Sequence, residues 1–292
     1  MTRGLVEIFG HAPDDFTPAA RKFWTLGVCP FVGRSCTKFD HTNTICYGTC
    51  SVTNTGHEVI ICPIRLYENN YASIRQVATD AFGAIPMYLF DQYLQAGSPL
   101  TDCVVALGQN SGREVKLKAM SMDWVLAHIS GGKLIEYIGI EVQSIDITGN
   151  YRDAWYAIRD KQTDVPQSRH GLNWANVHKR LIPQIIRKGL VYSRSTLVKK
   201  GLYFIVPDAV YQKFEDVIGK SIPQVTTPGP DTISVYTYEI GSTVSHGLMR
   251  SLNLKRTMRF KLGEFSNRFI SGPNLPGGLD LDKKIKDLLA VL

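Results

Sequence analysis

Residues 123–143 read DWVLAHISGGKLIEYIGIEVQ, two largely apolar runs on either side of a Gly-Gly pair. The pattern predicts two strands, over residues 124–129 and 137–147, joined by a short glycine-containing turn. Side chains two residues apart on a strand point to the same face of a sheet. We therefore expect Glu141 and Gln143 to share one face at the end of this hairpin.

Asp123 opens the first strand of the hairpin, so it is expected to lie beside Glu141 and Gln143. Two carboxylates placed together repel each other unless a cation lies between them, and carboxylate and amide oxygens are ligands that suit Mg²⁺. A bound Mg²⁺ activates water and stabilises the charge on a phosphate under attack. The pattern is typical of metal-dependent nucleases. Asp146 is out of register with Glu141 and is expected to face away, as an acceptor in the turn that ends the strand.

The chain has 292 residues, which allows one large domain or two small ones with a substantial core. It contains no window of 18 or more apolar residues, so we expect no transmembrane helix. Its first residues lack the hydrophobic region of a signal peptide. An intracellular, cytoplasmic protein is the resulting expectation.

The formal charge of +7 suggests an acidic partner, and its distribution is more informative than its sum. Neither residues 165–207 nor residues 250–261 contain any Asp or Glu. A solvated helix face usually mixes both signs, so two acid-free basic segments favour a surface that follows phosphates. The DNA-binding residues predicted in the first segment are Lys179, Arg180, Arg187, Lys188 and Arg194.

Five of the six cysteines cluster near the N-terminus, at Cys29, Cys36, Cys46, Cys50 and Cys62. Without a secretory context a disulfide framework is not expected, and clustered cysteines then indicate a metal site. Thiolates bind zinc or iron as four tetrahedral ligands.

The predicted ligands are Cys29, Cys36, Cys50 and Cys62, because two of them precede proline and two follow glycine-containing turns. Spacing alone does not separate Cys46 from Cys50 as the fourth ligand. His41 and His57 are also within range, and unliganded buried cysteines are the alternative. Cys103 lies in an apolar run and is expected to be a buried core thiol.

The remaining patterns predict a mixed central sheet flanked by helices, an α/β (α+β) fold. Helices are expected over residues 71–82, 151–160, 173–191 with a break at Pro183, 209–218 and 279–292. Further strands are expected over residues 103–107, 113–120, 202–206 and 233–240. The last helix is expected to turn Leu281, Ile285, Leu288 and Leu289 inward.

Three regions follow from these elements. Residues 1–70 form a small cysteine-rich metal-binding subdomain, and residues 71–205 form the catalytic core. Residues 206–292 are expected to complete that core and to serve DNA recognition or dimerisation.

Several short segments match one family in their order along the chain. They include EIFGH at 7–11, CPF at 29–31, GTC at 48–50, GRE at 112–114, MDW at 122–124, IGIEVQSID at 138–146 and LNWANVHKR at 172–180. With these segments the chain resembles the NotI-type restriction endonucleases, members of the PD-(D/E)xK nuclease superfamily. The likeness runs from about residue 7 to about residue 190 and fades beyond residue 200.

The resemblance implies that Asp123, Glu141 and Gln143 form the catalytic motif, with Glu114 as an accessory carboxylate near the metal. It also implies a structural iron ion in the four-cysteine site, where ligand chemistry alone suggests zinc. It further implies a homodimer that cuts a palindromic, GC-rich site in double-stranded DNA. Most of the superfamily carries Lys where this chain has Gln143. The metal itself, or a nearby lysine such as Lys116, would then have to supply the positive charge.

The function expected from the sequence is that of a type II restriction endonuclease with Mg²⁺-dependent hydrolysis of phosphodiester bonds. A DNA repair or structure-specific nuclease and a non-catalytic, metal-stabilised DNA-binding protein are the alternatives. An acyl-transfer enzyme built on Cys103 and His128 is disfavoured, because both residues lie in apolar strands.

Overall fold

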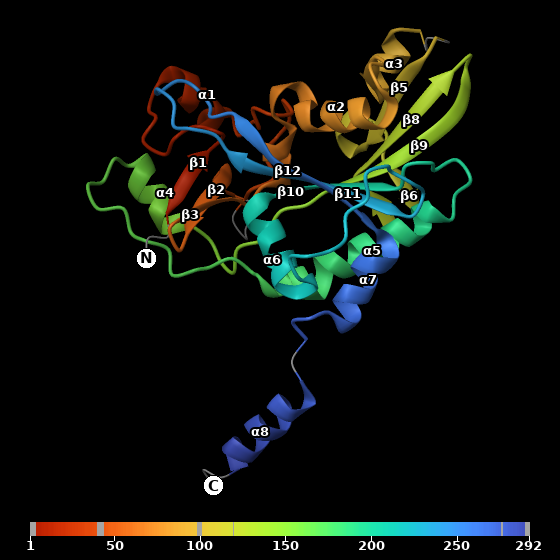
Figure 1. Cartoon of the computed structure of the whole chain (residues 1–292). Coiled ribbons are helices and arrows are strands. Elements are labelled where there is room, and N and C mark those ends of the chain that lie inside the picture. Colours follow the sequence, from red (N-terminus) through yellow and green to blue (C-terminus); the bar gives the residue numbers. More distant parts are fainter. Residues whose placement is uncertain (1–3, 40–43, 98–100, 119, 276, 290–292) are drawn as a thin grey trace.

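The computed structural model describes residues 4–39, 44–97, 101–118, 120–275 and 277–289 (Figure 1). A mixed seven-stranded sheet runs in the order β12-β11-β10-β9-β8-β5-β4. Its strands are β4 (Met87–Leu89), β5 (Cys103–Gly108), β8 (Trp124–Ser130), β9 (Lys133–Val142), β10 (Leu202–Pro207), β11 (Thr232–Ile240) and β12 (Leu252–Lys261). The three central strands β9, β10 and β11 are parallel, whereas β8 and β12 run antiparallel to their neighbours. This confirms the predicted mixed sheet flanked by helices.

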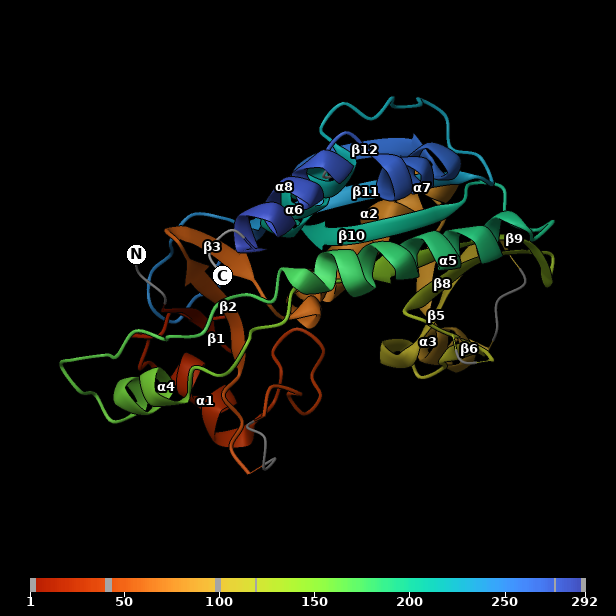
Figure 2. The same ribbon diagram turned by 90° about the horizontal axis from the view of Figure 1, so that it is seen from below.

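Alternating side chains of the sheet serve two separate cores. On β10, Leu202 and Phe204 pack with residues of α5 (Ile182–Ser193), α6 (Asp208–Ile218) and α7 (Leu262–Ser271). Tyr203 and Ile205, which point the other way, pack with α2 (Glu68–Phe82). Figure 2 shows α5, α6 and α7 on the near face of the sheet and α2 behind it. A strand buried on both faces explains why residues 202–206 read as a continuous apolar run.

The N-terminal part forms a separate three-stranded antiparallel sheet, β1 (Leu5–Ile8), β2 (Thr49–Asn54) and β3 (His57–Ile60). Its small core holds Cys29, Cys36 and Cys50 together with Trp155. The tryptophan belongs to α4 (Arg152–Arg159), so a helix from far along the chain covers the cysteine-rich segment (Figure 1). Two further helices belong to this part, α1 (Pro18–Leu26) and η1 (Pro63–Tyr67), whereas α3 (Phe90–Gln95) and η2 (Gln109–Ser111) lie beside β4 and β5 of the large sheet.

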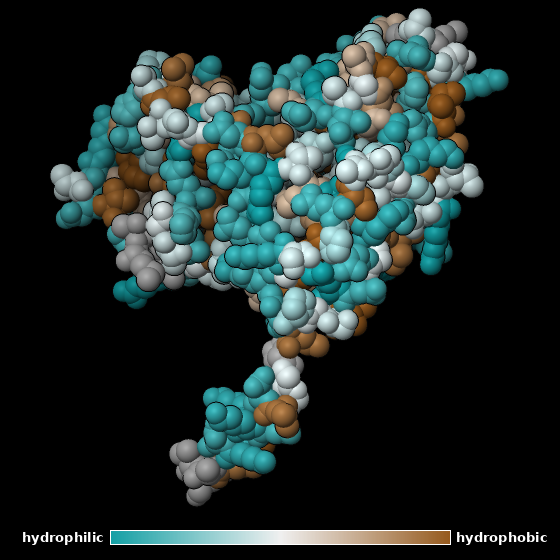
Figure 3. All heavy atoms as spheres, viewed as in Figure 1, coloured by the Kyte–Doolittle hydropathy of each residue, from teal (hydrophilic) through white to brown (hydrophobic). Residues whose placement is uncertain are grey.

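The prediction for the last helix is wrong in its packing. The helix α8 (Gly278–Leu289) exists, but Leu281, Ile285, Leu288 and Leu289 are between 46% and 63% exposed. It extends away from the body of the protein, and apolar side chains lie on its surface (Figures 1 and 3). The amphipathic pattern is real, but no core surface meets its apolar side among the described residues. The predicted end of this helix, at residues 290–292, lies outside them.

Three further differences concern element boundaries. The second strand of the hairpin ends at Val142 and not at residue 147. The region of residues 113–120 is a hairpin of β6 (Val115–Leu117) and β7 (Met120–Met122) and not one strand. The second basic segment forms strand β12, which the sequence pattern did not predict.

At Pro183 the predicted break is a change of hydrogen-bond pattern and not an interruption of the helix. A π-helical turn, η3 (Val177–Leu181), leads directly into α5, and Leu181 and Ile182 at the junction have right-handed helical backbone angles. The proline occupies the first turn of α5, where the π-helical pattern gives way to the α-helical one. Among the described residues, no helix combines the length and apolar character that crossing a membrane requires.

Candidate active site

The β8–β9 hairpin brings Asp123, Glu141 and Gln143 together. Trp124 pairs with Ile140, and the same register, continued by one residue, places Asp123 opposite Glu141. The Val142 amide donates to Asp123 Oδ2 at 2.9 Å, and Gln143 Nε2 donates to the same oxygen at 3.2 Å. Asp123 is therefore held in place by the strand that carries the other two residues.

Glu141 is almost fully buried, with 2% of its surface exposed. Burial, and then the negative charge of Asp123, raise the pKa of Glu141 to about 8, although a contact with Lys188 opposes the rise. Lys188 Nζ donates to Glu141 Oε2. The second oxygen, Oε1, accepts no hydrogen bond from a described residue, and close contact between the carboxyl groups of Glu141 and Asp123 adds to the rise in the Glu141 pKa. A buried carboxylate oxygen that accepts no hydrogen bond is costly, so Glu141 is a residue that could hold a cation together with Asp123.

A cavity of about 740 Å³ opens beside this group, with Asp123, Gln143 and Lys188 in its wall. On one side it is lined by Arg180 and by two exposed side chains of α5, Gln184 and Arg187. Residues 180, 184 and 187 follow the spacing of a single helix face. The β6–β7 hairpin lines the other side. The cavity thus combines a carboxylate pair with a basic wall, as a phosphate diester with a bound cation requires.

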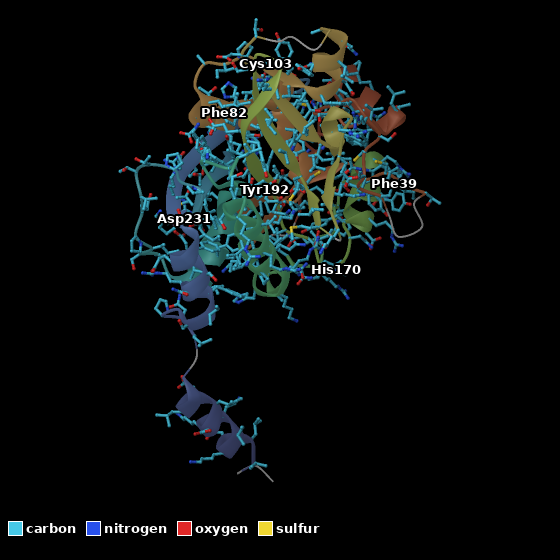
Figure 4. All side chains as sticks on the ribbon, turned by 90° about the vertical axis from the view of Figure 1, so that its right-hand side faces the viewer. Phe39, Phe82, Cys103, His170, Tyr192 and Asp231 are labelled. Atoms are coloured by element: carbon cyan, nitrogen blue, oxygen red, sulfur yellow. The ribbon has the colours of Figure 1, made fainter. Side chains whose placement is uncertain are left out.

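Tyr192 sets the distance between α5 and the hairpin. A side-chain carbon added to Gly139 would lie 2.1 Å from Cζ of Tyr192, so the tyrosine ring occupies the space above this glycine. Figure 4 shows Tyr192 between α5 and the strands. Lys188 lies one helical turn before Tyr192, and Glu141 lies two residues after Gly139 on the same face of β9. Packing of Tyr192 on Gly139 therefore places Lys188 on Glu141.

The other predicted residues have different surroundings. Glu114 forms an ion pair with Lys116 at 2.9 Å and accepts a hydrogen bond from Ser121, and Glu114 is not part of the cavity wall. The lysine that contacts Glu141 is thus Lys188 and not Lys116. Asp146 accepts a hydrogen bond from Asn176 at 3.2 Å and is exposed.

The two basic segments differ in how their charges are used. In the first segment Lys179, Arg180, Arg187 and Arg194 are exposed. Arg180 forms an ion pair with Asp146 at 3.6 Å, whereas Arg187 has no ion pair or hydrogen bond within the described part of the chain. In the second segment every cation has an acidic partner: Arg250 with Glu58, Lys255 with Glu239, Arg256 with Asp208, Arg259 with Asp80 and Lys261 with Asp231. Residues 250–261 therefore do not provide the free phosphate-binding surface that their composition predicts.

Four of the clustered cysteines, Cys29, Cys36, Cys50 and Cys62, are buried, and Cys46 is half-buried. Within the described ranges, no group of three or more His, Cys, Asp or Glu converges closely enough to hold a metal ion. Of the two histidines considered, His57 is exposed and His41 lies outside the described residues.

The sulfurs nevertheless share a pattern of hydrogen bonds. Cys29, Cys36, Cys46 and Cys62 each accept a hydrogen bond from the backbone N–H two residues later in the chain, at Phe31, Lys38, Gly48 and Ile64. The Cys50 thiol instead donates to the Gly48 carbonyl at 3.3 Å. Cys103 is 1% exposed, which confirms a buried core thiol, and it lies at the far end of the hairpin from Tyr192 (Figure 4).

Comparison with known proteins adds one match. The profile of a family described as restriction endonuclease NotI matches residues 22–224, which is well over half of the chain and includes the whole candidate site. No curated protein matches the chain.

Proposed function

The chain belongs to the NotI restriction endonuclease family, and we propose that it is a type II enzyme that hydrolyses double-stranded DNA with Mg²⁺. The observation that carries the proposal is made at buried Glu141, whose Oε1 accepts no hydrogen bond from a described residue. Its neighbour Asp123 lies in the wall of a cavity that has arginines on one side. A divalent cation would stabilise this pair of carboxylates most, and a phosphate backbone would stabilise the positive charges of the cavity wall most.

Asp123 and Glu141 fit a Mg²⁺ site because both offer hard oxygen ligands, and Glu141 offers one that the protein leaves unused. When bound, the ion would supply an activated water and charge for the attacked phosphate. The protein's own contribution is to hold the ligands. Gln143 and the Val142 amide fix Asp123 through Oδ2, so that its other oxygen is left for the site.

DNA binding is assigned to the side of the cavity formed by η3 and α5. Arg180 and Arg187 lie in the cavity wall and are placed to contact phosphates that flank the cut. Lys179 and Arg194 are exposed on the same segment and would contact the duplex further away. We propose a palindromic, GC-rich target, since arginine recognises guanine through O6 and N7 in the major groove.

A homodimer is part of the same proposal, because a two-fold target is most simply read by a two-fold protein. The exposed apolar residues of α8 support it, since a second subunit is one surface that could cover them. Sedimentation of the full chain with and without DNA measures the oligomeric state, and a monomer on DNA would contradict this part.

The decisive experiment is a digest of DNA of known sequence with Mg²⁺, repeated with Asp123→Ala. We expect discrete fragments from the wild type and, from the variant, no cleavage but retained binding. Diffuse products would favour a repair or structure-specific nuclease. Binding without cleavage by the wild type under all metal conditions would favour the non-catalytic DNA-binding protein.

For the N-terminal cysteines we propose a structural zinc or iron site. Its ligands would be Cys29, Cys36 and Cys62, with either Cys46 or Cys50 as the fourth. Backbone N–H groups that point at sulfur stabilise a thiolate, the form that binds metal. Cys46 shares this arrangement with the first three and is in hydrogen-bond contact with Cys36, which favours it over Cys50 as the fourth ligand.

Metal analysis of purified protein tests this site and identifies the ion. Cys46→Ser should lower the bound metal, whereas Cys50→Ser should keep one ion per chain. The reverse result would restore Cys50 as the ligand, and an ion-free wild type would leave the cysteines as core thiols.

A further inference from the structure

Lys188 is buried among apolar side chains, an environment that destabilises a charged ammonium group. It is 8% exposed, and its neighbours along α5 at Ile185 and Tyr192 belong to the apolar core. A buried ammonium group costs several kcal/mol unless it is paired. Its only ion pair among the described residues is with Glu141, which belongs to the proposed metal site. The lysine therefore does not serve as a free DNA contact, and its position needs another explanation.

The backbone around Lys188 is built so that the contact can form. Gly139 leaves room for the Tyr192 ring on the sheet side. Gly189 leaves room for α7 on the other side, since a side-chain carbon there would lie 2.9 Å from Leu262 Cδ1. The helix is thus fixed between the sheet and α7, at a distance from which Lys188 Nζ reaches Glu141 Oε2.

Lys188 also supplies a charge that the hairpin lacks. Gln143 is a neutral side chain that is already engaged with Asp123. Lys188 shares the cavity wall with both of these residues but comes from a segment more than 40 residues later in the chain. It contacts one oxygen of Glu141 and leaves the other without a partner.

We propose that Lys188 is a positioning residue for DNA hydrolysis. It holds Glu141 through Oε2, so that Oε1 is presented to the metal, and it places a fixed positive charge beside the phosphate under attack. This inference rests on the proposed nuclease function. The alternatives are a lysine that only balances a buried charge and a lysine that binds DNA.

The proposal predicts opposite effects on two measurements. Lys188 neutralises part of the charge of the two carboxylates, so its removal leaves a more negative site that attracts a divalent cation more strongly. Removal of Lys188 also takes away the positive charge beside the reacting phosphate and the contact that holds Glu141 in place. A neutral variant should therefore bind metal more tightly and cleave more slowly.

The experiment compares Lys188→Met with Lys188→Arg in the full chain, using Mn²⁺ titration calorimetry, DNA binding with Ca²⁺, and single-turnover cleavage with saturating Mg²⁺. For Lys188→Met we expect cleavage slower by about 100-fold or more, Mn²⁺ affinity higher by about tenfold, and DNA affinity within about threefold of wild type. Lys188→Arg keeps the charge and should keep the Mn²⁺ affinity of the wild type. Circular dichroism and thermal unfolding of each variant establish that it is folded.

Three outcomes overturn the inference. Cleavage by Lys188→Met within threefold of wild type leaves only a charge-balancing lysine. A loss of DNA affinity that matches the loss of cleavage makes Lys188 a DNA contact. An Mn²⁺ affinity of folded Lys188→Met equal to that of the wild type shows that Lys188 neither offsets the carboxylate charge nor holds Glu141 for the metal. If the wild type cleaves no DNA, the proposed nuclease function fails instead, and the Mn²⁺ titration still tests the position of Lys188.

Discussion

Two buried carboxylates, each paired with a buried cation, have opposite roles in this protein. Glu7 and Arg65 are both fully buried, and every polar group of the pair is used. Arg65 donates to both oxygens of Glu7, and Ser51 donates to one of them as well. Glu141 and Lys188 are almost as deeply buried, but Glu141 leaves one oxygen without a partner beside a cavity.

We propose that the difference separates an ion pair that builds the fold from one that prepares chemistry. Arg65 also donates to Glu68 and to the Arg250 carbonyl, and its guanidinium lies over the Phe31 ring. This saturated network joins the cysteine-rich segment, the start of α2 and the loop before β12. A pair with every hydrogen bond made fixes structure, whereas a pair with an open oxygen can still bind a cation.

The largest effect is expected at the Glu141–Lys188 pair, in which Oε1 of Glu141 accepts no hydrogen bond. Glu141→Gln removes the charged ligand, so we expect cleavage of plasmid DNA with Mg²⁺ to fall by about a thousandfold or more. The free energy of unfolding should fall by about 2 kcal/mol, less than at a fully enclosed ion pair, because Lys188 lines the cavity and water there can hydrate its ammonium group. Asp153→Asn is the control outside the cavity, and its exposed carboxylate should leave cleavage within threefold of wild type. Equal losses in both variants would contradict the assignment.

A substitution in the Glu7–Arg65 pair should change the free energy of unfolding. Glu7→Gln leaves Arg65 buried with an incomplete set of partners, and we expect a loss of about 3–5 kcal/mol in the free energy of unfolding, measured by urea titration. Glu239→Gln, which removes the partner of exposed Lys255, is the control and should cost less than about 1 kcal/mol. A small effect of Glu7→Gln would show that the network does not hold the two parts together.

These two pairs also show what a sequence can and cannot predict. The β8–β9 hairpin was predictable, because strand register is a local property and places Asp123 opposite Glu141. Lys188 was predicted only as one cation among several. It reaches Glu141 through the packing of α5 on the sheet, and the glycines that permit this packing carry no signal of their own in the sequence.

The prediction that residues 250–261 form a free basic surface was wrong for the same reason. Residues 250–261 have no acidic neighbours in sequence, but their partners come from distant segments, as Glu58 does for Arg250 and Asp80 does for Arg259. The helical pattern of residues 279–292 was predicted correctly, whereas its burial was not, because amphipathicity does not state which surface will meet the apolar side.

The contrast between free and paired cations can be tested on DNA affinity. Arg187→Ala removes an unpaired cation of the cavity wall, and Lys255→Ala removes a paired cation of β12. We expect Arg187→Ala to weaken DNA binding about tenfold and to reduce the slope of log Kd against log salt by about 1. Lys255→Ala should leave both quantities almost unchanged. Identical behaviour of the two variants would mean that net charge alone, and not its placement, controls binding.

The smallest effect is expected at a third buried carboxylate, Asp15. Asp15 accepts several hydrogen bonds but is not paired with a lysine or arginine among the described residues. Burial acts to raise the pKa of Asp15, but hydrogen bonds from Thr17, the Gly247 amide and His11 outweigh it and lower the pKa to about 2. Because the folded pKa lies below the usual value of 3.8, this stabilisation is present above pH 4 and is lost as the pH falls towards 2.

The size of that stabilisation is on the order of 1–2 kcal/mol. Asp15→Asn should unfold more easily than the wild type near pH 6 by this amount, and the gap between the two proteins should close between pH 4 and pH 2 in urea titrations. Other acids titrate over the same range, so the difference between the two proteins is the informative quantity. A gap that stays constant with pH would mean that Asp15 contributes through packing alone, and hydrogen bonds to its charge would then not link α1 to the loop at Gly247.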